Sequence, residues 1–293
     1  MRSANQIEVL TRINLEDMLV SFGWQHWKAG RWLGSALFTR PARKFARQVI
    51  ALDEGVHQSG LQEGARQILP RFVRGLKVYG LATIPTSGGL LVLSNHPGMV
   101  DTLALFASLP RTDLRVMGSE RPFLTALPAI SRLMIYVPEA TENRLAVIRQ
   151  VARALRAGES VLTFPAGHIE PDPAVLPGAV EALSDWSDSI GIFVRAAPNL
   201  SIVGAVVSHV LAPQATYHPL TRLRRQKKDR ESLGATLQLI ANTLFPWIWP
   251  VVPEITYTPP LSAASLAGLH DPRAITYAVK EYMRPFIEGA KHV

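Results

Sequence analysis

Cysteine is absent from all 293 residues of the chain. This absence excludes disulfide bonds, thiolate metal sites and a cysteine nucleophile. Acidic residues are also scarce, because 23 Asp and Glu side chains stand against 31 Lys and Arg, a formal net charge of +8. A basic chain favours an anionic partner, which can be a nucleic acid, an anionic membrane or a phosphorylated small molecule. No nucleic-acid recognition motif or base-stacking sheet is readable, so the sequence predicts no nucleic-acid partner.

The first residues lack an apolar leader. Residues Met1–Thr11 are polar and contain no apolar core of the length that a secretory signal requires, so we expect a cytoplasmic location. Over the whole chain 47% of the residues are hydrophobic, which supports a sizeable core. The length suits one large domain or two small ones.

Negative charge is missing from a long N-terminal stretch. Between Asp17 and Asp53 there is no acidic residue, and basic side chains are interleaved with aromatic and leucine side chains. Basic helices with such an apolar face are typical of a membrane interface, where rings settle at headgroup level and cations meet anionic lipid. The alternative is a helical hairpin packed on the main domain, with solvated cations. Pro41 predicts a break into two helices at Thr39–Arg40.

A second stretch without charge covers residues 232–253 and follows a basic cluster at residues 222–230. Its length suffices to span a bilayer, but four polar side chains and two prolines argue against a clean spanning helix. Interfacial or re-entrant membrane contact is the preferred interpretation, and a buried helix is the alternative. The predicted membrane surface therefore consists of residues 18–47 and 222–250.

From residue 71 onward, short apolar segments alternate with segments of helical character. Such alternation predicts an α/β fold with a mostly parallel central sheet flanked by helices. Strands are predicted near residues 71–79, 90–93, 114–117, 133–137, 160–164, 202–207 and 252–258, and helices near 102–109, 121–130, 142–157, 176–187 and 273–288. The predicted organisation is an N-terminal amphipathic helical segment over residues 1–70 and an α/β domain over residues 71–293, with an insertion at residues 208–250.

One predicted strand ends in a turn that contains a histidine. Leu90–Leu93 is followed by Ser-Asn-His-Pro-Gly, and Asp101 comes at the start of the next helix. Because His96 precedes that helix, the Asp101 carboxylate can fold back toward the imidazole, fix its tautomer and leave the other ring nitrogen as a base. The alternative is a solvated histidine beside a helix-capping aspartate. The carboxyl ends of strands are where open α/β sheets form their sites.

A second strand, near residues 160–164, runs into a similar loop. Its proline- and glycine-rich turn contains Phe164, Pro165, Gly167, His168 and Glu170. Gly167 permits close approach of backbone to a ligand, and successive turn amides can bind an anion. Two such turns at neighbouring strand ends would line one cleft, whereas the alternative is a proline-stiffened loop.

Both loops resemble motifs of the glycerolipid (lysophosphatidic acid-type) acyltransferase family. Asn95–Asp101 is similar to the family's Asn-His-x4-Asp block, and Phe164–Gly167 is similar to its Phe-Pro-Glu-Gly block. Between them, Met117–Pro128 resembles the block that follows the second strand, and Ile202–Val207 lies where the family has a late strand. The resemblance covers roughly residues 72 to 211 and implies an acyltransferase with the fold of that family.

The resemblance implies a direct acyl transfer. His96 would take the proton of an acceptor hydroxyl, and Asp101 would orient the imidazole and stabilise its charged form. The acceptor oxygen would attack the thioester of acyl-CoA or of an acyl carrier protein, with no acyl-enzyme intermediate, no metal and no other cofactor. Turn amides near Gly98 or Gly167 are candidate donors to the oxyanion. The residues expected to contact substrate are Asn95, Gly98, Arg121, Phe164, Pro165, Gly167, His168 and Glu170.

The loop after the second strand departs from the family pattern. Ala166 stands in place of the family's Glu, and His168-Ile169 stands in place of Thr-Arg. Ile169 cannot supply the bidentate phosphate contact of the family's arginine. Arg121 is the preferred substitute, and Arg144 is the less favoured alternative. A hydroxylated lipid or a glycolipid precursor requires less phosphate recognition than glycerol 3-phosphate or lysophosphatidate, so we leave the acceptor open.

We therefore predict a membrane-associated O-acyltransferase, similar to 1-acylglycerol-3-phosphate O-acyltransferases. It would act at the cytoplasmic face of the cell membrane as a peripheral or monotopic protein. The acceptor would be a glycerolipid, a lyso-phospholipid or a related lipid. Two alternatives are a hydrolase or thioesterase that uses the same His/Asp pair to activate water, and a catalytically altered relative that only binds lipid.

Overall fold

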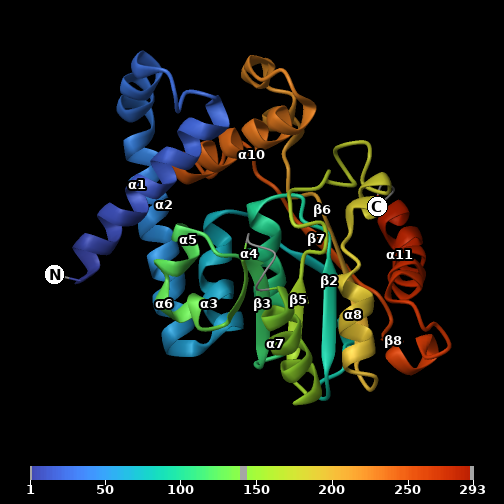
Figure 1. Ribbon diagram of the computed structural model, residues 1–293. Coiled ribbons are helices and arrows are strands. Elements are labelled where there is room, and N and C mark those ends of the chain that lie inside the picture. The colour runs from blue at the N-terminus through green and yellow to red at the C-terminus, as the bar shows by residue number, and fades with distance from the viewer. Residues whose placement is uncertain (1, 139–143, 291–293) are drawn as a thin grey trace. The chain divides into compact units, whose positions relative to one another are not determined.

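The computed structural model describes residues 2–138 and 144–290 (Figure 1). The chain divides into two compact units, and each unit is assembled from segments that are distant in the sequence. A helical unit consists of residues up to 75 together with 121–131 and 211–252, and a sheet unit consists of the remaining residues. The predicted N-terminal segment and most of the predicted insertion therefore share one unit.

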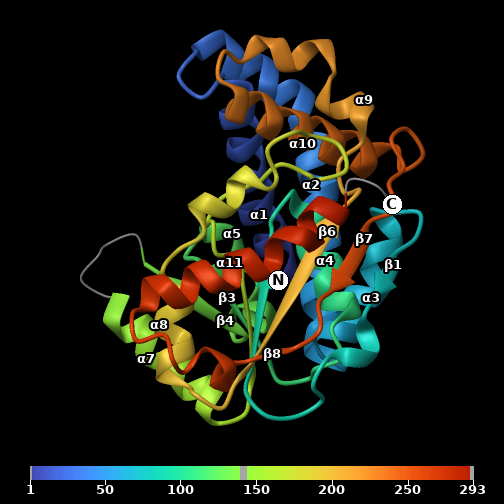
Figure 2. The same ribbon diagram turned by 90° about the vertical axis from the view of Figure 1, so that its right-hand side faces the viewer.

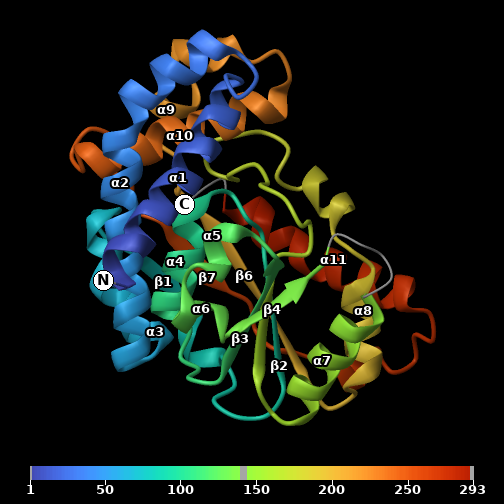
Figure 3. The same ribbon diagram turned by 60° about the vertical axis from the view of Figure 1, so that its left-hand side comes forward.

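The helical unit combines helices from the N-terminal part of the chain with helices from the two later segments (Figure 3). Its elements are α1 (Arg2–Phe22), α2 (Lys28–Ser59), α3 (Leu61–Ile68), η1 (Leu69–Arg71), α5 (Pro122–Thr125), α6 (Pro128–Ser131), α9 (Pro213–Thr216), η5 (Pro219–Leu223) and α10 (Lys227–Leu244). An aromatic contact and a hydrogen bond attach residues 121–131 to α2. The Phe45 and Phe123 rings stack with centroids 6.0 Å apart, and the Asp53 Oδ1 atom accepts the Ile130 amide at 2.9 Å.

The break between the two N-terminal helices lies at residues 23–27, so the predicted break at Pro41 is wrong. Gly23 has a φ of 75°, a left-handed conformation that glycine adopts without strain and that ends α1. Pro41 is buried inside α2, which continues for 18 residues beyond it. A proline inside a helix costs about 3 kcal/mol, and here the buried neighbours Phe38, Ala42 and Phe45 provide packing that offsets this cost.

The sheet unit is built on an eight-stranded sheet, and the predicted α/β fold with a mostly parallel sheet is confirmed. The strand order is β1-β7-β6-β2-β5-β3-β4, and β8 also pairs with β6. Pairs β6–β7 and β6–β8 are antiparallel, and the other pairs are parallel. The strands are β1 (Lys77–Tyr79), β2 (Leu90–Ser94), β3 (Leu114–Ser119), β4 (Met134–Val137), β5 (Ser160–Thr163), β6 (Ser201–Ser208), β7 (Glu254–Tyr257) and β8 (Leu261–Ser262).

Helices cover both faces of this sheet (Figure 2). The helices and turns of the unit are η2 (Leu81–Thr83), α4 (Met99–Ser108), α7 (Arg144–Arg156), η4 (Glu181–Asp185), α8 (Ser189–Ala196), η6 (Ala263–Leu266) and α11 (Pro272–Gly289). Leu91 and Leu93 of β2 belong to one buried cluster with residues of α7, α8 and α11. Because side chains alternate along a strand, Leu90 and Val92 point to the opposite face, where α4 lies. All of these strand residues are fully buried, as a central parallel strand requires.

Two predicted helices have different bounds. The predicted helix at 121–130 is two short helices, each of which begins at a proline, the residue favoured at the first helical position. The predicted helix at 176–187 is mostly turn, with only η4 near its end, because Pro177 and Gly178 disrupt its start. A helix that the sequence pattern did not predict, α8, follows directly.

The contact between α8 and α11 depends on Gly191. A Cβ atom at this position would overlap the Pro272 carbonyl group, because the two backbones lie in direct contact. We expect Gly191→Ala to lower the free energy of unfolding by about 2–4 kcal/mol, since a backbone cannot yield as a flexible side chain does. Thermal denaturation measures this loss. Gly268→Ala is the control, since nothing lies within 4 Å of its added Cβ, and an equal effect of both variants would contradict the assignment.

Candidate active site

The candidate site forms where β2 ends, between its two parallel neighbours. The pairing of Leu93 with Thr163 brings the loop after β5 beside the turn after β2, and the pairing of Ser94 with Ala205 brings the end of β6 to the other side. The two histidine-bearing loops therefore leave the sheet at neighbouring strand ends, as the sequence predicted. All residues of these three segments up to Val210 belong to the sheet unit.

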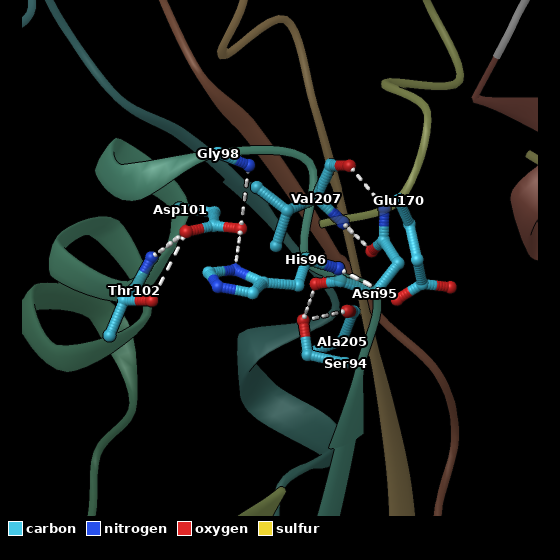
Figure 4. Close-up of polar contacts among 9 residues, drawn as sticks. All are labelled: Ser94, Asn95, His96, Gly98, Asp101, Thr102, Glu170, Ala205 and Val207. Atoms are coloured by element: carbon cyan, nitrogen blue, oxygen red, sulfur yellow. Dashed lines mark hydrogen bonds and ion pairs between the residues drawn. The ribbon is translucent and has the colours of Figure 1, made fainter. Parts of the chain in front are cut away.

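Asn95 joins the turn to β6. Its side-chain amide donates to the Val207 carbonyl at 2.8 Å and accepts the Val207 amide at 2.8 Å, which imitates one further step of a β ladder (Figure 4). Ser94, also buried, donates its hydroxyl to the Ala205 carbonyl at 2.8 Å. Asn95 is only 3% exposed. The structure therefore differs from the predicted substrate contact, because both polar groups of this amide bind backbone.

His96 and Asp101 are in direct contact. The imidazole Nδ1 atom lies 2.7 Å from Asp101 Oδ2, and Asp101 is fully buried. The same carboxylate oxygen accepts the Gly98 amide at 3.2 Å, and Oδ1 accepts the backbone amide and the hydroxyl of Thr102 (Figure 4). A carboxylate with donors on both oxygens is held in one orientation, so the imidazole that it contacts is held as well.

The helix α4 begins at Met99, earlier than predicted, so Asp101 is its third residue and not its cap. In this position the carboxylate reaches back to the amide of Gly98, the residue before the helix, as the acidic residue of a capping box does. A carboxylate at the N-terminus of a helix also interacts favourably with the helix dipole.

Phe164 packs against the histidine. The ring centroids of His96 and Phe164 lie 4.5 Å apart at an interplanar angle of 34°. The neighbouring Pro165 is buried, and its carbonyl accepts the Ser187 amide at 3.0 Å. The imidazole therefore has two neighbours in this structure: the Phe164 ring of the loop after β5 and the Asp101 carboxylate.

The amides proposed for the oxyanion have other partners in the structure. Gly98 donates its N–H to Asp101, and Gly167 donates its N–H to the Phe164 carbonyl at 3.0 Å. Neither amide is therefore available in this conformation, which differs from the prediction. Gly167 has a φ of 69°, and a Cβ atom added there would meet nothing within 4 Å, so open space adjoins this turn.

Two other residues that were predicted to contact substrate, His168 and Arg121, interact with carboxylates elsewhere in the structure. His168 Nδ1 lies 2.8 Å from the Ala166 carbonyl, and its Nε2 lies 3.3 Å from the Asp185 carboxylate, so it ties its own loop to η4. Arg121 belongs to the helical unit, where its charge lowers the pKa of Asp17 against the larger opposing effect of burial.

Glu170 is buried and holds the histidine turn through hydrogen bonds to the His96 backbone. Its carboxylate Oε2 accepts the His96 amide at 3.0 Å (Figure 4). The other oxygen, Oε1, accepts the Trp186 indole N–H at 2.8 Å. The Glu170 amide in turn donates to the His96 carbonyl at 2.8 Å. Burial raises the pKa of Glu170 to about 7, although the hydrogen bonds from Trp186 and His96 act in the opposite direction. This internal position differs from the predicted substrate contact.

Two further residues that hold the surrounding loops were not predicted. Asp172 is fully buried, and its carboxylate accepts the amides of His209 at 3.1 Å and Val210 at 2.8 Å, just after β6. His209 has a φ of 57°, which is unusual outside glycine. The only sequence signal for Asp172 was its place in a proline-rich loop after a strand. Trp186 gave no signal, because it lies 16 residues from its partner Glu170.

Residues 75–203 match the family model of acyltransferases. The match confirms the resemblance for this part of the chain, and it includes both histidine-bearing loops. Among solved structures, the chain is similar to the crystal structure of PlsC, the 1-acyl-sn-glycerophosphate (LPA) acyltransferase of Thermotoga maritima. The sequences are 12% identical, the TM-score is 0.49 and both chains are covered completely. That similarity is too low to bear on activity. No curated protein matches the chain in sequence.

The raised pKa of Glu170 predicts a pH-dependent stability. Between pH 4.5 and about 7 the unfolded chain releases a proton that the folded protein retains, so this group's contribution to stability falls as pH rises. The loss amounts to at most about 3 kcal/mol. Glu170→Gln does not titrate, so we expect its melting temperature to rise relative to the unmodified protein as the pH increases from 5 to 8.

Thermal denaturation at several pH values measures this difference. The exposed Glu181→Gln is the control, and its melting temperature should follow that of the unmodified protein at every pH. A difference for Glu170→Gln that stays constant from pH 5 to 8 would contradict the buried titration.

Proposed function

We propose that this protein transfers a fatty acyl group from a thioester donor to a hydroxyl group of a lipid at a membrane surface. The observation that carries the proposal is the 2.7 Å contact between His96 Nδ1 and the buried Asp101 carboxylate, at the carboxyl end of a parallel strand. The acyltransferase-family match over residues 75–203 supports the reaction class.

In the proposed reaction His96 acts as a general base. With Nδ1 directed at Asp101, Nε2 is the nitrogen that takes the proton of the acceptor hydroxyl while its oxygen attacks the thioester carbonyl carbon. Asp101 stabilises the imidazolium that forms. Collapse of the tetrahedral intermediate breaks the carbon–sulfur bond, and the imidazolium returns the proton to the departing thiolate. The products are an ester and a free thiol, and no acyl-enzyme is required.

The acceptor that we propose is a hydroxylated lipid whose binding does not rely on a phosphate clamp in the loop after β5. The position of the family's phosphate-binding arginine is held by Ile169, which is apolar. Acyl-CoA and an acyl carrier protein both present the required thioester, and we propose either as donor. The acceptor class includes glycerolipids, lyso-phospholipids and glycolipid precursors.

We propose that the helical unit contacts the membrane from the cytoplasmic side. In the part of the chain that the structure describes, no helix combines the length and apolar character needed to cross a bilayer. Several predicted membrane residues, among them Phe22 and Phe38, are buried in the unit's own core. Other large apolar side chains of the unit are exposed, namely Trp27, Trp32, Leu33, Leu37, Tyr217, Leu220, Leu223, Phe245, Trp247 and Ile248. Trp32 is 75% exposed and Trp247 is 64% exposed, which suits rings that settle among lipid headgroups.

The His/Asp pair leads to a direct test. We expect His96→Ala to lower the rate of acyl transfer about 10³-fold or more and Asp101→Asn about 10²-fold or more, because the base and its orientation are lost. The assay combines radiolabelled acyl-CoA, or a labelled acyl carrier protein, with a membrane lipid extract and identifies products by mass analysis. The exposed His270→Ala is the control. Full activity of His96→Ala would disprove the proposed mechanism.

The same assay distinguishes the alternatives. Release of thiol without acceptor, together with free fatty acid as product, indicates a thioesterase. Binding of a lyso-lipid without thiol release from any donor indicates a protein that only binds lipid.

The exposed tryptophans provide a test of membrane contact. We expect the double variant Trp32→Ser/Trp247→Ser to bind anionic phospholipid vesicles about tenfold or more weakly, because two large apolar side chains no longer enter the interface. Vesicle flotation of the full chain measures binding. Tyr277→Ser, which alters an equally exposed aromatic residue of the sheet unit, is the matched control. Unchanged flotation of the double variant would contradict the proposed contact.

A further inference from the structure

His96 is held by two different carboxylates. Asp101 contacts its side chain at Nδ1, and Glu170 contacts its backbone amide at 3.0 Å. The Glu170 amide also donates to the His96 carbonyl at 2.8 Å, so both backbone groups of His96 are bonded to one residue of the loop after β5. Asp101 therefore sets the rotation of the imidazole, whereas Glu170 sets the position of the backbone from which the imidazole extends.

Holding a backbone amide with a buried carboxylate carries a large desolvation penalty. Glu170 is 3% exposed, and burying a charge costs far more than burying an amide or an apolar group of similar size. Glutamine carries no charge, but its single acceptor oxygen could satisfy only one of the two N–H donors that face the Glu170 carboxylate. The second carboxylate oxygen is bonded to the Trp186 indole, which is itself 2% exposed, so the charge is stabilised from outside the histidine turn.

We propose that Glu170 is a positioning residue for the proposed acyl transfer, whose ionised carboxylate holds the His96 turn in the reactive geometry and favours the imidazolium. This inference rests on the proposed function of His96. The negative charge of Glu170 and the positive charge of a protonated His96 attract each other, as the lowering of the Glu170 pKa by His96 indicates. When Glu170 is protonated, both the charge-assisted hydrogen bond to the His96 amide and this attraction are lost.

The proposal predicts that two groups control activity on the acidic side. Burial places the Glu170 pKa at about 7, and an imidazole ordinarily titrates near pH 6.5. The titratable groups on the segments that contact Glu170 are His96 and Asp101 after β2, His168 and Asp172 on its own loop, and Asp185 beside Trp186. His96 lowers the Glu170 pKa and Asp101 raises it. His168 and Asp185 pair with each other, and Asp172 binds the amides of His209 and Val210.

Trp186→Phe tests the ionised state of Glu170 without touching His96. The variant removes the indole N–H together with part of a buried ring. The hydrogen bond from this N–H lowers the Glu170 pKa, so we expect the pKa to rise in its absence. We expect kcat at pH 9 to stay within about threefold of the unmodified protein, and the acidic midpoint of the kcat profile to move up by about 1 pH unit. A purely structural role would instead lower kcat by one factor at every pH.

Glu170→Gln is the second variant in the test of the positioning role. We expect kcat at pH 9 to fall about tenfold or more with KM changed less than about twofold, because the substrate surface is untouched while the base is displaced. The slope of the acidic limb should fall from two protons to one. Adding Trp186→Phe to Glu170→Gln should then leave the midpoint unchanged, since the titrating group has been removed. Wild-type kcat and slope in Glu170→Gln would overturn the proposal.

A measurement without turnover separates this proposal from the proposed function. NMR of histidine-labelled protein follows the His96 imidazole, which is assigned by its loss in His96→Gln. We expect the His96 titration midpoint to move to lower pH in Glu170→Gln, because the imidazolium loses a nearby negative charge. An unchanged midpoint would overturn the coupling. A shifted midpoint in a protein without acyl-transfer activity would overturn the proposed function alone.

Discussion

A carboxylate that is sealed from water needs hydrogen-bond donors on both of its oxygens, and the turn between β2 and α4 is arranged to meet this need at Asp101. The donors are the His96 imidazole, the Gly98 amide and the amide and hydroxyl of Thr102. All of them lie within seven consecutive positions. The rest of the site is attached to this turn, since Asn95 fastens it to β6 and Glu170 fastens it to the loop after β5.

The second carboxylate, Glu170, shows how stability and reactivity oppose each other here. Its burial penalises the charged form, so the fold is more stable when Glu170 is protonated. The hydrogen bonds from the His96 amide and the Trp186 indole offset only part of that cost. A neutral glutamine at this position would leave one of these two N–H donors without an acceptor, which the carboxylate avoids. A buried carboxylate beside an imidazole is typical of a site in which a defined geometry is kept although it lowers the stability of the fold.

The difference between local and distant contacts explains what could be predicted from the sequence. The His96–Asp101 pair and the strands around it follow from short-range patterns, and the structure has the two residues in contact. Asn95, His168 and Glu170 were expected to contact substrate because they lie in the two loops that resemble the family's motifs. Their actual partners, Val207, Asp185 and Trp186, lie 16 to 112 residues away. No periodicity or spacing encodes such pairings, and the same reason explains why Pro41 does not interrupt a well-packed α2.

The proposed chemistry of the site and the proposed selection of an acceptor depend on different loops. The pair proposed to handle the proton depends on the turn after β2, whereas the resemblance places phosphate recognition in the loop after β5. In that loop Ala166 packs against the apolar core, His168 is directed at Asp185, and Ile169 offers no donor. Such a loop cannot form the bidentate contact by which arginine holds a phosphate. If the protein is the proposed acyltransferase, exchange of this loop's polar side chains should change which hydroxyl compound it accepts while His96 stays in place, provided that the two hydrogen bonds between Glu170 and the His96 backbone remain.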